Sequence, residues 1–191
     1  MNICIYGASS NEIDKLYIDK VESLGALLAK KGHTLIFGGG GNGVMGASAR
    51  GVNSEKGKII GVVPSFLNVD GMLFDKCDEI IYTETMRERK QKMEDLSDAF
   101  IMAPGGIGTY EEFFEILTLK QLGRHSKAIV IYNINSYFDK FLKMLEKTAK
   151  TGFMKKTCLD IFMVSDDEKE IMEYIENYIP ENADVKKFKD I

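Results

Sequence analysis

The chain has 191 residues, of which 45% are hydrophobic and 28% are charged, the balance of an ordinary globular protein with one full core. Its formal net charge of −4 argues against a general nucleic-acid binder, which normally presents a basic face. Three widely spaced cysteines without a C-x-x-C pair predict neither a disulfide framework nor a zinc site. The sequence shows no basic leader and no long apolar segment, so we expect a cytoplasmic protein that does not enter a membrane.

Short apolar runs alternate with helical patterns along the chain. The expected strands are Asn2–Tyr6, Thr34–Phe37, Lys58–Val63, Glu79–Tyr82, Ala99–Ala103, Lys127–Tyr132 and Ile161–Val164. The expected helices are about Lys15–Lys31, Val44–Ser54, Met86–Ser97, Thr109–Leu122, Tyr137–Thr151 and Asp167–Tyr178. This alternation predicts an α/β fold: one Rossmann-like, doubly wound domain over residues 1–179, with about seven mainly parallel strands and helices on both faces. Residues 180–191 form a polar C-terminal tail that we expect to be loosely held.

Ligands of such sheets bind at the carboxyl ends of the strands, where glycine-rich segments follow the second and fifth expected strands. The first, Gly38–Gly46, contains a formal G-x-G-x-x-G. It is a weak sign of a dinucleotide, because no carboxylate ends the next strand. One interpretation is a turn needed only for tight packing of strand on helix. Six glycines in nine residues favour contact with a phosphate or a ribose.

The second segment, Pro104–Glu112, follows an apolar strand and opens a helix. Its glycines would let the backbone approach a ligand closely, with the N–H groups of the helix start facing a phosphate. An alternative interpretation explains Thr109 and Glu112 alone. Thr109-x-x-Glu112 is a formal capping box, which would begin a helix without any ligand. A capping box does not require the glycines upstream, so we favour a phosphate cradle with a carboxylate beside it.

The helical segment from Met86 to Leu96 carries an arginine on its apolar stripe. Met86, Met93 and Leu96 recur at helical spacing, and Arg89 falls on the same face, with Lys90 at its edge. Such an arginine either meets a carboxylate, a phosphate or a partner surface, or runs its stem along apolar surface and leaves its head in water. The two interpretations are even on the sequence alone. No cluster of His, Cys and Asp has the spacing of metal ligands.

These motifs resemble those of the LONELY GUY family of cytokinin riboside 5′-monophosphate phosphoribohydrolases, often labelled lysine decarboxylase-like. The family pattern P-G-G-x-G-T-x-x-E is present without a departure from Pro104 to Glu112, and M-H-x-R-K corresponds to Met86–Lys90. The family's Gly-Gly-Gly-Ser-x-Gly-Leu-Met-Gly loop corresponds to Gly38–Gly46. The chain departs from the family at Arg87, where a histidine is usual, and at Gly41, where a serine could touch the ligand. The resemblance runs from the first strand to at least Phe153.

The resemblance implies hydrolysis of the N-glycosidic bond of a cytokinin or purine nucleoside 5′-monophosphate, giving free base and ribose 5-phosphate, without a metal or organic cofactor. It implies Glu112 and Arg89 as catalytic residues, and a homodimer with the site at the interface. Phe113, Phe114, Ile116 and Leu117 offer apolar surface for such a dimer. The substrate-binding residues implied are Ser9, Gly39, Gly40, Gly43, Met86, Lys90, Gly105, Gly106, Ile107, Gly108, Thr109 and Thr118.

Two other functions remain in view. A nucleotide- or molybdenum-cofactor-binding carrier protein would share the glycine motif without the hydrolysis, although Arg89, Lys90 and Glu112 together favour the enzyme. Lysine decarboxylation would require pyridoxal phosphate on a lysine, and no lysine lies in a recognisable site for it.

Overall fold

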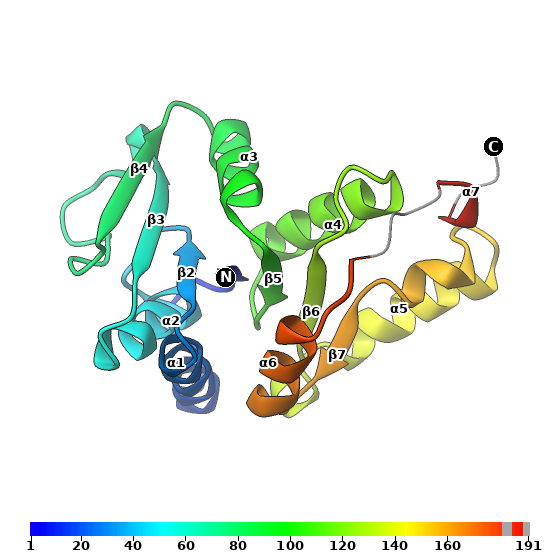
Figure 1. Ribbon diagram of the computed structural model, residues 1–191, viewed down its shortest axis with the longest axis horizontal. Coiled ribbons are helices and arrows are strands. Elements are labelled where there is room, and N and C mark those ends of the chain that lie inside the picture. The colour runs from blue at the N-terminus through cyan, green and yellow to red at the C-terminus, as the bar shows by residue number, and fades with distance from the viewer. Residues whose placement is uncertain (181–184, 189–191) are drawn as a thin grey trace.

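The computed structural model describes residues 1–180 and 185–188. Within them, parallel strands form one seven-stranded sheet in the order β4-β3-β2-β1-β5-β6-β7 (Figure 1). The strands are β1 (Asn2–Tyr6), β2 (Thr34–Phe37), β3 (Ile59–Pro64), β4 (Glu79–Thr83), β5 (Ala99–Met102), β6 (Ala128–Tyr132) and β7 (Met163–Ser165). The predicted α/β class, doubly wound and parallel, is confirmed.

Among the described residues, five of the six longer helices connect successive strands and the sixth follows the last strand, whereas the segment between β3 and β4 holds only a short 3₁₀ turn. The six helices are α1 (Lys15–Lys30), α2 (Gly43–Ser54), α3 (Met86–Leu96), α4 (Ile107–Gln121), α5 (Asp139–Lys150) and α6 (Glu168–Glu176), with short 3₁₀ turns η1 (Ser65–Leu67), η2 (Ile134–Ser136) and η3 (Lys156–Leu159). Across the described residues, no helix has both the length and the apolar character that crossing a membrane requires.

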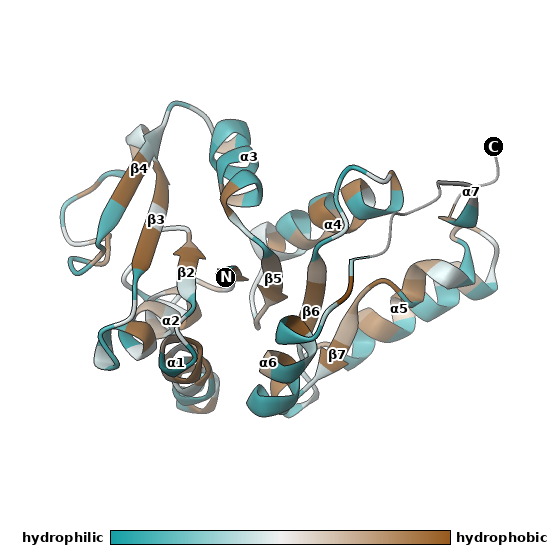
Figure 2. Ribbon diagram, in the orientation of Figure 1, coloured by the Kyte–Doolittle hydropathy of each residue, from teal (hydrophilic) through white to brown (hydrophobic). Residues whose placement is uncertain are grey.

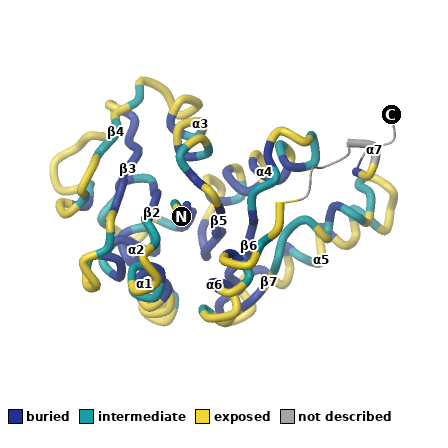
Figure 3. The backbone as a smooth tube through the Cα atoms, in the orientation of Figure 1, coloured by how far each residue is buried: buried dark blue, intermediate teal, exposed yellow. Residues whose placement is uncertain are grey.

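The central strands are buried on both faces, which explains their continuous apolar sequences. In β1, Ile3 and Ile5 face the core under α1, α2 and α6, whereas Cys4 and Tyr6 face the core under α3, α4 and α5. Brown, apolar strands therefore lie between helices whose teal faces point outward (Figure 2), and the dark, buried trace follows the middle of the sheet (Figure 3).

The chain order reverses at the centre of the sheet. Successive strands run outward from β1 to β4 on one side and from β5 to β7 on the other. The connections after β1 and β5 therefore diverge to opposite faces and leave a crevice at the carboxyl ends of these two strands. Gly7–Ser10, which includes the predicted ligand residue Ser9, follows β1, and Pro104–Gly106 of the second glycine segment follows β5, so these two segments meet here. Their backbones are in direct contact, since the Ala8 N–H donates to the Pro104 carbonyl at 3.1 Å.

Two helix starts lie two residues away from the sequence prediction. Helix α4 begins at Ile107 rather than near Thr109, because Gly106 is its N-cap. Helix α5 begins at Asp139 rather than Tyr137, because η2 precedes it and carries Asn135 in the left-handed region at φ 49°.

Part of the expected tail is ordered. Residues 185–188 form a short helix, α7 (Val185–Phe188), in which Phe188 is buried and the Lys187 carbonyl accepts from the Thr157 hydroxyl at 2.8 Å. Residues 181–184 and 189–191 of that tail lie outside the described residues.

Candidate active site

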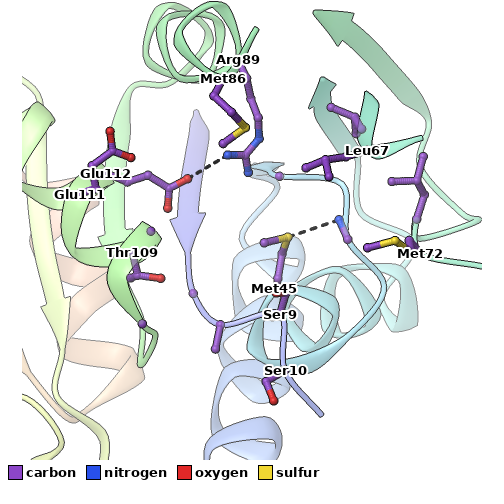
Figure 4. A pocket seen from close by; sticks show the side chains of 18 residues that line it. Ser9, Ser10, Met45, Leu67, Met72, Met86, Arg89, Thr109, Glu111 and Glu112 are labelled. Atoms are coloured by element: carbon purple, nitrogen blue, oxygen red, sulfur yellow. Dashed lines mark hydrogen bonds and ion pairs between the residues drawn. The ribbon is translucent and has the colours of Figure 1, made fainter. Parts of the chain in front are cut away.

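A cavity of about 420 Å³ lies at the carboxyl ends of β1, β2, β3 and β5 (Figure 4). It is enclosed by the loop after β1, the first glycine loop, the segment between β3 and β4, and the starts of α3 and α4. The residues that line it are Gly7, Ala8, Ser9, Ser10, Gly38, Gly40, Met45, Val63, Leu67, Met72, Leu73, Met86, Arg89, Gly106, Gly108, Thr109, Glu111 and Glu112.

A buried ion pair forms one wall of the cavity. Arg89 Nη1 lies 3.1 Å from Glu112 Oε1, and the two side chains are only 7% and 11% exposed (Figure 4). Arg89 Nε also donates to the Val62 carbonyl of β3 at 3.1 Å, which fixes the direction of the guanidinium. The inward interpretation of Arg89 is therefore confirmed, and its partner is a carboxylate of the same chain.

Local sequence places this arginine. A capping box of Thr85 and Glu88 begins α3: the Thr85 hydroxyl accepts from the Glu88 N–H at 3.1 Å, and the Glu88 carboxylate accepts from the Thr85 N–H at 3.3 Å. Arg89 then lies one turn before Met93, which is 1% exposed in the core. Gly38 completes the fit, because a Cβ there would lie 2.0 Å from Arg89 Nη2. Arg87 is exposed, so the departure from the family's histidine lies on the solvent side.

Burial and the arginine act on Glu112 in opposite directions. Removal from water raises the pKa of the Glu112 carboxyl, the Arg89 guanidinium lowers it, and burial prevails to give a pKa of about 7. A carboxyl that exchanges its proton near neutral pH suits acid–base work. Lys90 does not line the cavity; its ammonium contacts the carboxylates of Glu111 and Glu115, with a 2.7 Å distance to Glu115 Oε2.

The N-terminus of α4 opens onto the cavity. Its N-cap, Gly106, provides no side-chain hydrogen bond, and within the described chain the N–H groups of Ile107, Gly108 and Thr109 have no acceptor. A Cβ at Gly106 or Gly108 would meet nothing within 4 Å. Free N–H groups, open space and the positive end of the helix dipole are the features that favour an anion at the start of a helix.

The alternative interpretation of Thr109 and Glu112 as a capping box is not borne out. Both residues lie inside α4 rather than at its start, and the Glu112 side chain turns toward Arg89 instead of back to the backbone. Because the cap is a glycine with no side chain, nothing on the protein competes for the first N–H groups of the helix.

The first glycine loop is built differently. A Cβ at Gly39 would lie 2.3 Å from the Val63 side chain, one at Gly43 would lie 2.5 Å from the Ser10 carbonyl oxygen, and one at Gly46 would lie 1.9 Å from the Gly41 carbonyl oxygen. Protein atoms also take N–H groups at the start of α2, since Gly43 donates to Asn11 Oδ1 at 2.9 Å and Met45 donates to the Ala8 carbonyl at 3.0 Å. Packing thus accounts for most of these glycines.

The structure brings part of the predicted set together. Lining the cavity are Ser9, Gly40, Met86, Arg89, Gly106, Gly108, Thr109 and Glu112. Outside that lining are Gly39, Gly43, Lys90, Gly105, Ile107 and Thr118. Of these, Ile107 is 89% exposed, Thr118 is exposed on α4, and Gly105 lies behind Thr109, with a Cβ that would sit 2.1 Å from its Oγ1.

An apolar wall was not anticipated from the sequence. Leu67, Met72 and Leu73 come from the segment between β3 and β4, and they line the cavity together with Met45 of α2 (Figure 4). The segment reaches the site through an isolated antiparallel bridge between Gly40 and Leu73, with the Gly41 N–H donating to the Met72 carbonyl at 2.9 Å. No motif marks it. Ser10, in contrast, adjoins Ser9 after β1 and could have been found by its place.

Comparisons with known proteins identify the family of the chain. Residues 45–175 match the family described as "Possible lysine decarboxylase". The chain is 31% identical over 182 residues to cytokinin riboside 5′-monophosphate phosphoribohydrolase LOG2 of Arabidopsis thaliana, covering 95% of this chain and 85% of that protein. It is 33% identical over 183 residues to the Arabidopsis thaliana enzyme LOG1, covering 96% and 86%.

Solved structures share the fold at lower identity. The molybdenum cofactor binding protein from the phototrophic bacterium Rippkaea orientalis superposes with a TM-score of 0.69 at 22% identity, covering 92% of this chain and 93% of that one. The Moco carrier protein from Chlamydomonas reinhardtii gives the same TM-score and identity, covering 92% and 94%. At this identity the likeness describes the architecture. The family match and the curated relatives, each covering most of the chain, show that this protein belongs to the LONELY GUY (LOG) family.

Proposed function

We propose that the protein hydrolyses the N-glycosidic bond of a nucleoside 5′-monophosphate, releasing the free base and ribose 5-phosphate. The observation that carries the proposal is the pairing of Arg89 with Glu112 on a cavity that also receives the uncapped N-terminus of α4. A carboxylate that faces a sugar and an anion site that holds its phosphate are the two parts this reaction needs. The activity for which the two Arabidopsis thaliana relatives are named supports the same reaction.

The chemistry follows from the charge that develops. Breaking the bond between the ribose C1′ and the base nitrogen leaves positive charge on the ribose ring, as in glycoside hydrolysis. In our proposal the Glu112 carboxylate stabilises that charge and accepts a proton from the water whose oxygen bonds to C1′. The bonding electrons leave with the base nitrogen, which is then protonated. Arg89 holds ribose hydroxyls or the phosphate, or assists the leaving base.

The cavity suggests how a nucleotide would lie. The 5′-phosphate would take the N–H groups of Gly106–Thr109, which places the ribose near Glu112. The base would then extend toward the apolar wall formed by Met45, Leu67 and Met72 (Figure 4). Flexible methionine side chains adapt to bases of different shape, and they suit adenine with or without an apolar substituent.

Assembly as a homodimer with the site at the interface belongs to the same proposal. Arg89 is the one cationic residue in the described cavity lining, and it faces Glu112, with Glu111 close by. A phosphate dianion would gain from a further cation supplied by a second copy. The apolar surface first expected to drive dimerisation is largely absent, because Phe113, Ile116 and Leu117 are buried within the chain and only Phe114, at 38%, is exposed. Sedimentation showing a monomer at assay concentration would contradict the dimer.

The test is incubation with AMP and with its N6-isopentenyl form, followed by chromatography for free base. We expect base release by the wild-type protein and a loss of at least about 10³-fold in kcat for Glu112→Gln, with nucleotide binding retained. Arg89→Ala should remain folded and lose turnover or binding. A protein that binds nucleotides but releases base from none of them would be a carrier, and the hydrolase proposal would be rejected.

Lysine decarboxylation receives no support from the cavity. Pyridoxal phosphate enzymes attach the cofactor to a lysine, and no lysine is among the described residues that line this cavity. The nearest candidate in the motifs, Lys90, is engaged with two carboxylates on the α4 side.

A further inference from the structure

Tyr137 contacts the second glycine loop from behind. Its hydroxyl donates a hydrogen bond of 2.8 Å to the Gly105 carbonyl. The tyrosine follows β6, the neighbour of β5, so it arrives at the same edge of the sheet as the loop that it contacts. It does not line the cavity, and it lies outside the segments that match the motifs of the family.

This contact sets the direction of one peptide group. The described peptide bonds are all trans, so the C=O of Gly105 and the N–H of Gly106 point in opposite directions. Drawing the carbonyl toward Tyr137 therefore turns the Gly106 N–H away from Tyr137. Because both residues of this peptide are glycines, the peptide group can adopt several orientations. A contact from outside the loop can therefore determine which of them it adopts.

The preceding peptide is fixed as well. The Pro104 carbonyl accepts from the Ala8 N–H at 3.1 Å, which ties the loop to the end of β1. Two consecutive carbonyls, those of Pro104 and Gly105, thus have partners outside the loop, whereas the N–H groups that follow have none within the described chain. The carbonyl groups of the loop thus bind other parts of the protein, and the N–H groups that follow stay available to a ligand.

The segment that delivers Tyr137 is strained. Asn135 and Ser136 have φ of 49° and 58°, in the left-handed region that non-glycine residues rarely adopt. Asn133 holds the turn: its Oδ1 accepts from the Phe138 N–H at 2.7 Å and its Nδ2 donates to Asp139 at 2.9 Å. Strained backbone persists where its surroundings determine it, and such strain clusters around functional sites.

Two aromatic contacts also hold the ring of Tyr137, which is 41% exposed. It meets the ring of Tyr17 from α1 edge-on at 5.8 Å between centroids, and that of Phe138 at 4.9 Å. Both contacts are between aromatic faces and edges, so they survive removal of the hydroxyl. A phenylalanine at this position would keep the ring and lose the hydroxyl, with its bond to the Gly105 carbonyl and its contact with the Tyr110 side chain.

We propose that Tyr137 is a positioning residue, which orients the Gly105–Gly106 peptide so that the loop presents its N–H groups to the phosphate of the substrate. The inference rests on the proposed function, since it assigns the loop to the 5′-phosphate. It predicts an effect on ligands that carry a phosphate and none on ligands that lack one.

The test compares Tyr137→Phe with Tyr132→Phe. Tyr132→Phe also removes one hydroxyl, which donates to Glu168 Oε1 at 2.9 Å. This hydroxyl lies on the face of the sheet that is covered by α6. For Tyr137→Phe we expect KM for AMP and the inhibition constant of ribose 5-phosphate to rise about 3- to 10-fold, the range of one hydrogen bond. We expect kcat to change less than about twofold, and inhibition by adenosine to stay unchanged. Tyr132→Phe should leave all of these values at the wild-type level.

A second measurement separates this inference from the proposed function. The amide resonance of Gly106 should shift in Tyr137→Phe and stay in place in Tyr132→Phe, and calorimetry should show weaker binding of ribose 5-phosphate by the first variant alone. These outcomes support the inference even if the wild-type protein releases no base. An unmoved Gly106 resonance, an equal loss of affinity for adenosine and AMP, or wild-type protein that does not bind ribose 5-phosphate would overturn it.

Discussion

In the first glycine loop, the absent side chains make room for other parts of the protein. In the second, the absent side chains of Gly106 and Gly108 leave open space in the cavity, and only Gly105 is packed against a neighbour. The helix starts differ in the same way, because α2 has its N–H groups taken by Asn11 and Ala8 whereas α4 has its first N–H groups free.

This difference shows why a glycine count is a poor guide to a ligand. The first loop has six glycines in nine residues, yet most of them are explained by Val63, Ser10, Arg89 and neighbouring backbone. The second loop has fewer glycines, yet the first N–H groups of the helix that follows it have no acceptor within the described chain. What distinguishes them is whether donors remain unused after the protein has folded, and that is a property of the tertiary structure.

Gly43→Ala is the strongest test of the difference between the packed first glycine loop and the open second one. Gly43 has φ of 59°, and a Cβ would lie 2.5 and 2.6 Å from two carbonyl oxygens, those of Ser10 and Ala8. We expect a loss of about 2–4 kcal/mol in the free energy of unfolding, measured with denaturant. Gly71→Ala is the matched control, since Gly71 has φ of 78° with nothing within 4 Å, and it should lose only about 1 kcal/mol. Equal losses in the two variants would refute the packing role.

The pH dependence of activity and of stability tests the role of Glu112, which lies on α4 after the second loop. Because the pKa of Glu112 is about 7, kcat/KM should fall about tenfold for each pH unit below 7 as the carboxylate is protonated. Stability should change the other way. The folded pKa exceeds the ordinary value of 4.5, so the folded state binds more protons between pH 4.5 and 7, and this group's contribution to stability falls as pH rises through that window. In Glu112→Gln both effects should vanish; a flat activity profile from pH 7 to 5 in the wild type would contradict the role of Glu112.

Gly108→Ala should separate stability from activity. Gly108 lies in the first turn of α4 with open space where a Cβ would be, so alanine should raise the free energy of unfolding by about 0.5–1 kcal/mol. The same methyl group would enter the cavity and raise KM for AMP, by about tenfold if it costs one phosphate contact. Thermal melts and steady-state kinetics on one preparation measure both. A more stable variant with unchanged KM would remove the second loop from the binding site.

The smallest effect is expected from Gly41→Ser, which restores the residue usual in the family. A Cβ at position 41 would lie 3.3 Å from the Leu73 carbonyl oxygen and points at that backbone, and Gly41 does not line the cavity. We expect a stability change within about 0.5 kcal/mol and less than a twofold change in KM. A change of fivefold or more in KM would show that the serine reaches the ligand.

Much of the fold could be predicted because both faces of the central strands are buried. That burial produces continuous apolar runs, and the intervening helices repeat at their own period. Local chemistry was harder to read, as two Thr-x-x-Glu patterns show. The pattern at Thr85 and Glu88 caps α3, whereas the one at Thr109 and Glu112 lies inside α4. The residue types at these positions are the same in both segments. The difference lies in where the helix begins: α3 begins directly after Thr85, whereas α4 begins after Gly106, before Thr109 is reached.

The parts of the site that could be predicted are those whose sequence pattern lies within a single helix or turn. Periodicity placed Arg89 on the buried face of α3, and the strand-to-helix turn marked the N-terminus of α4. The apolar wall of Leu67, Met72 and Leu73 depends on a bridge to the first glycine loop, which no local pattern reports. The surface of α4 was misjudged because α4 packs on the sheet and on α5 as well, so that Phe113 contacts Phe141 with centroids 5.6 Å apart.

The contact between Arg89 and Glu112 has a thermodynamic consequence for binding. Without a ligand, the guanidinium lowers the pKa of the carboxyl beside it. On the proposed function, a nucleotide that takes Arg89 for its own oxygen atoms removes this influence and brings further negative charge, so the pKa of Glu112 rises. Association at neutral pH then carries a proton from the buffer into the protein. Binding heats measured in two buffers of different ionisation enthalpy would differ in proportion to that uptake, and identical heats would show that the pair stays intact when the ligand arrives.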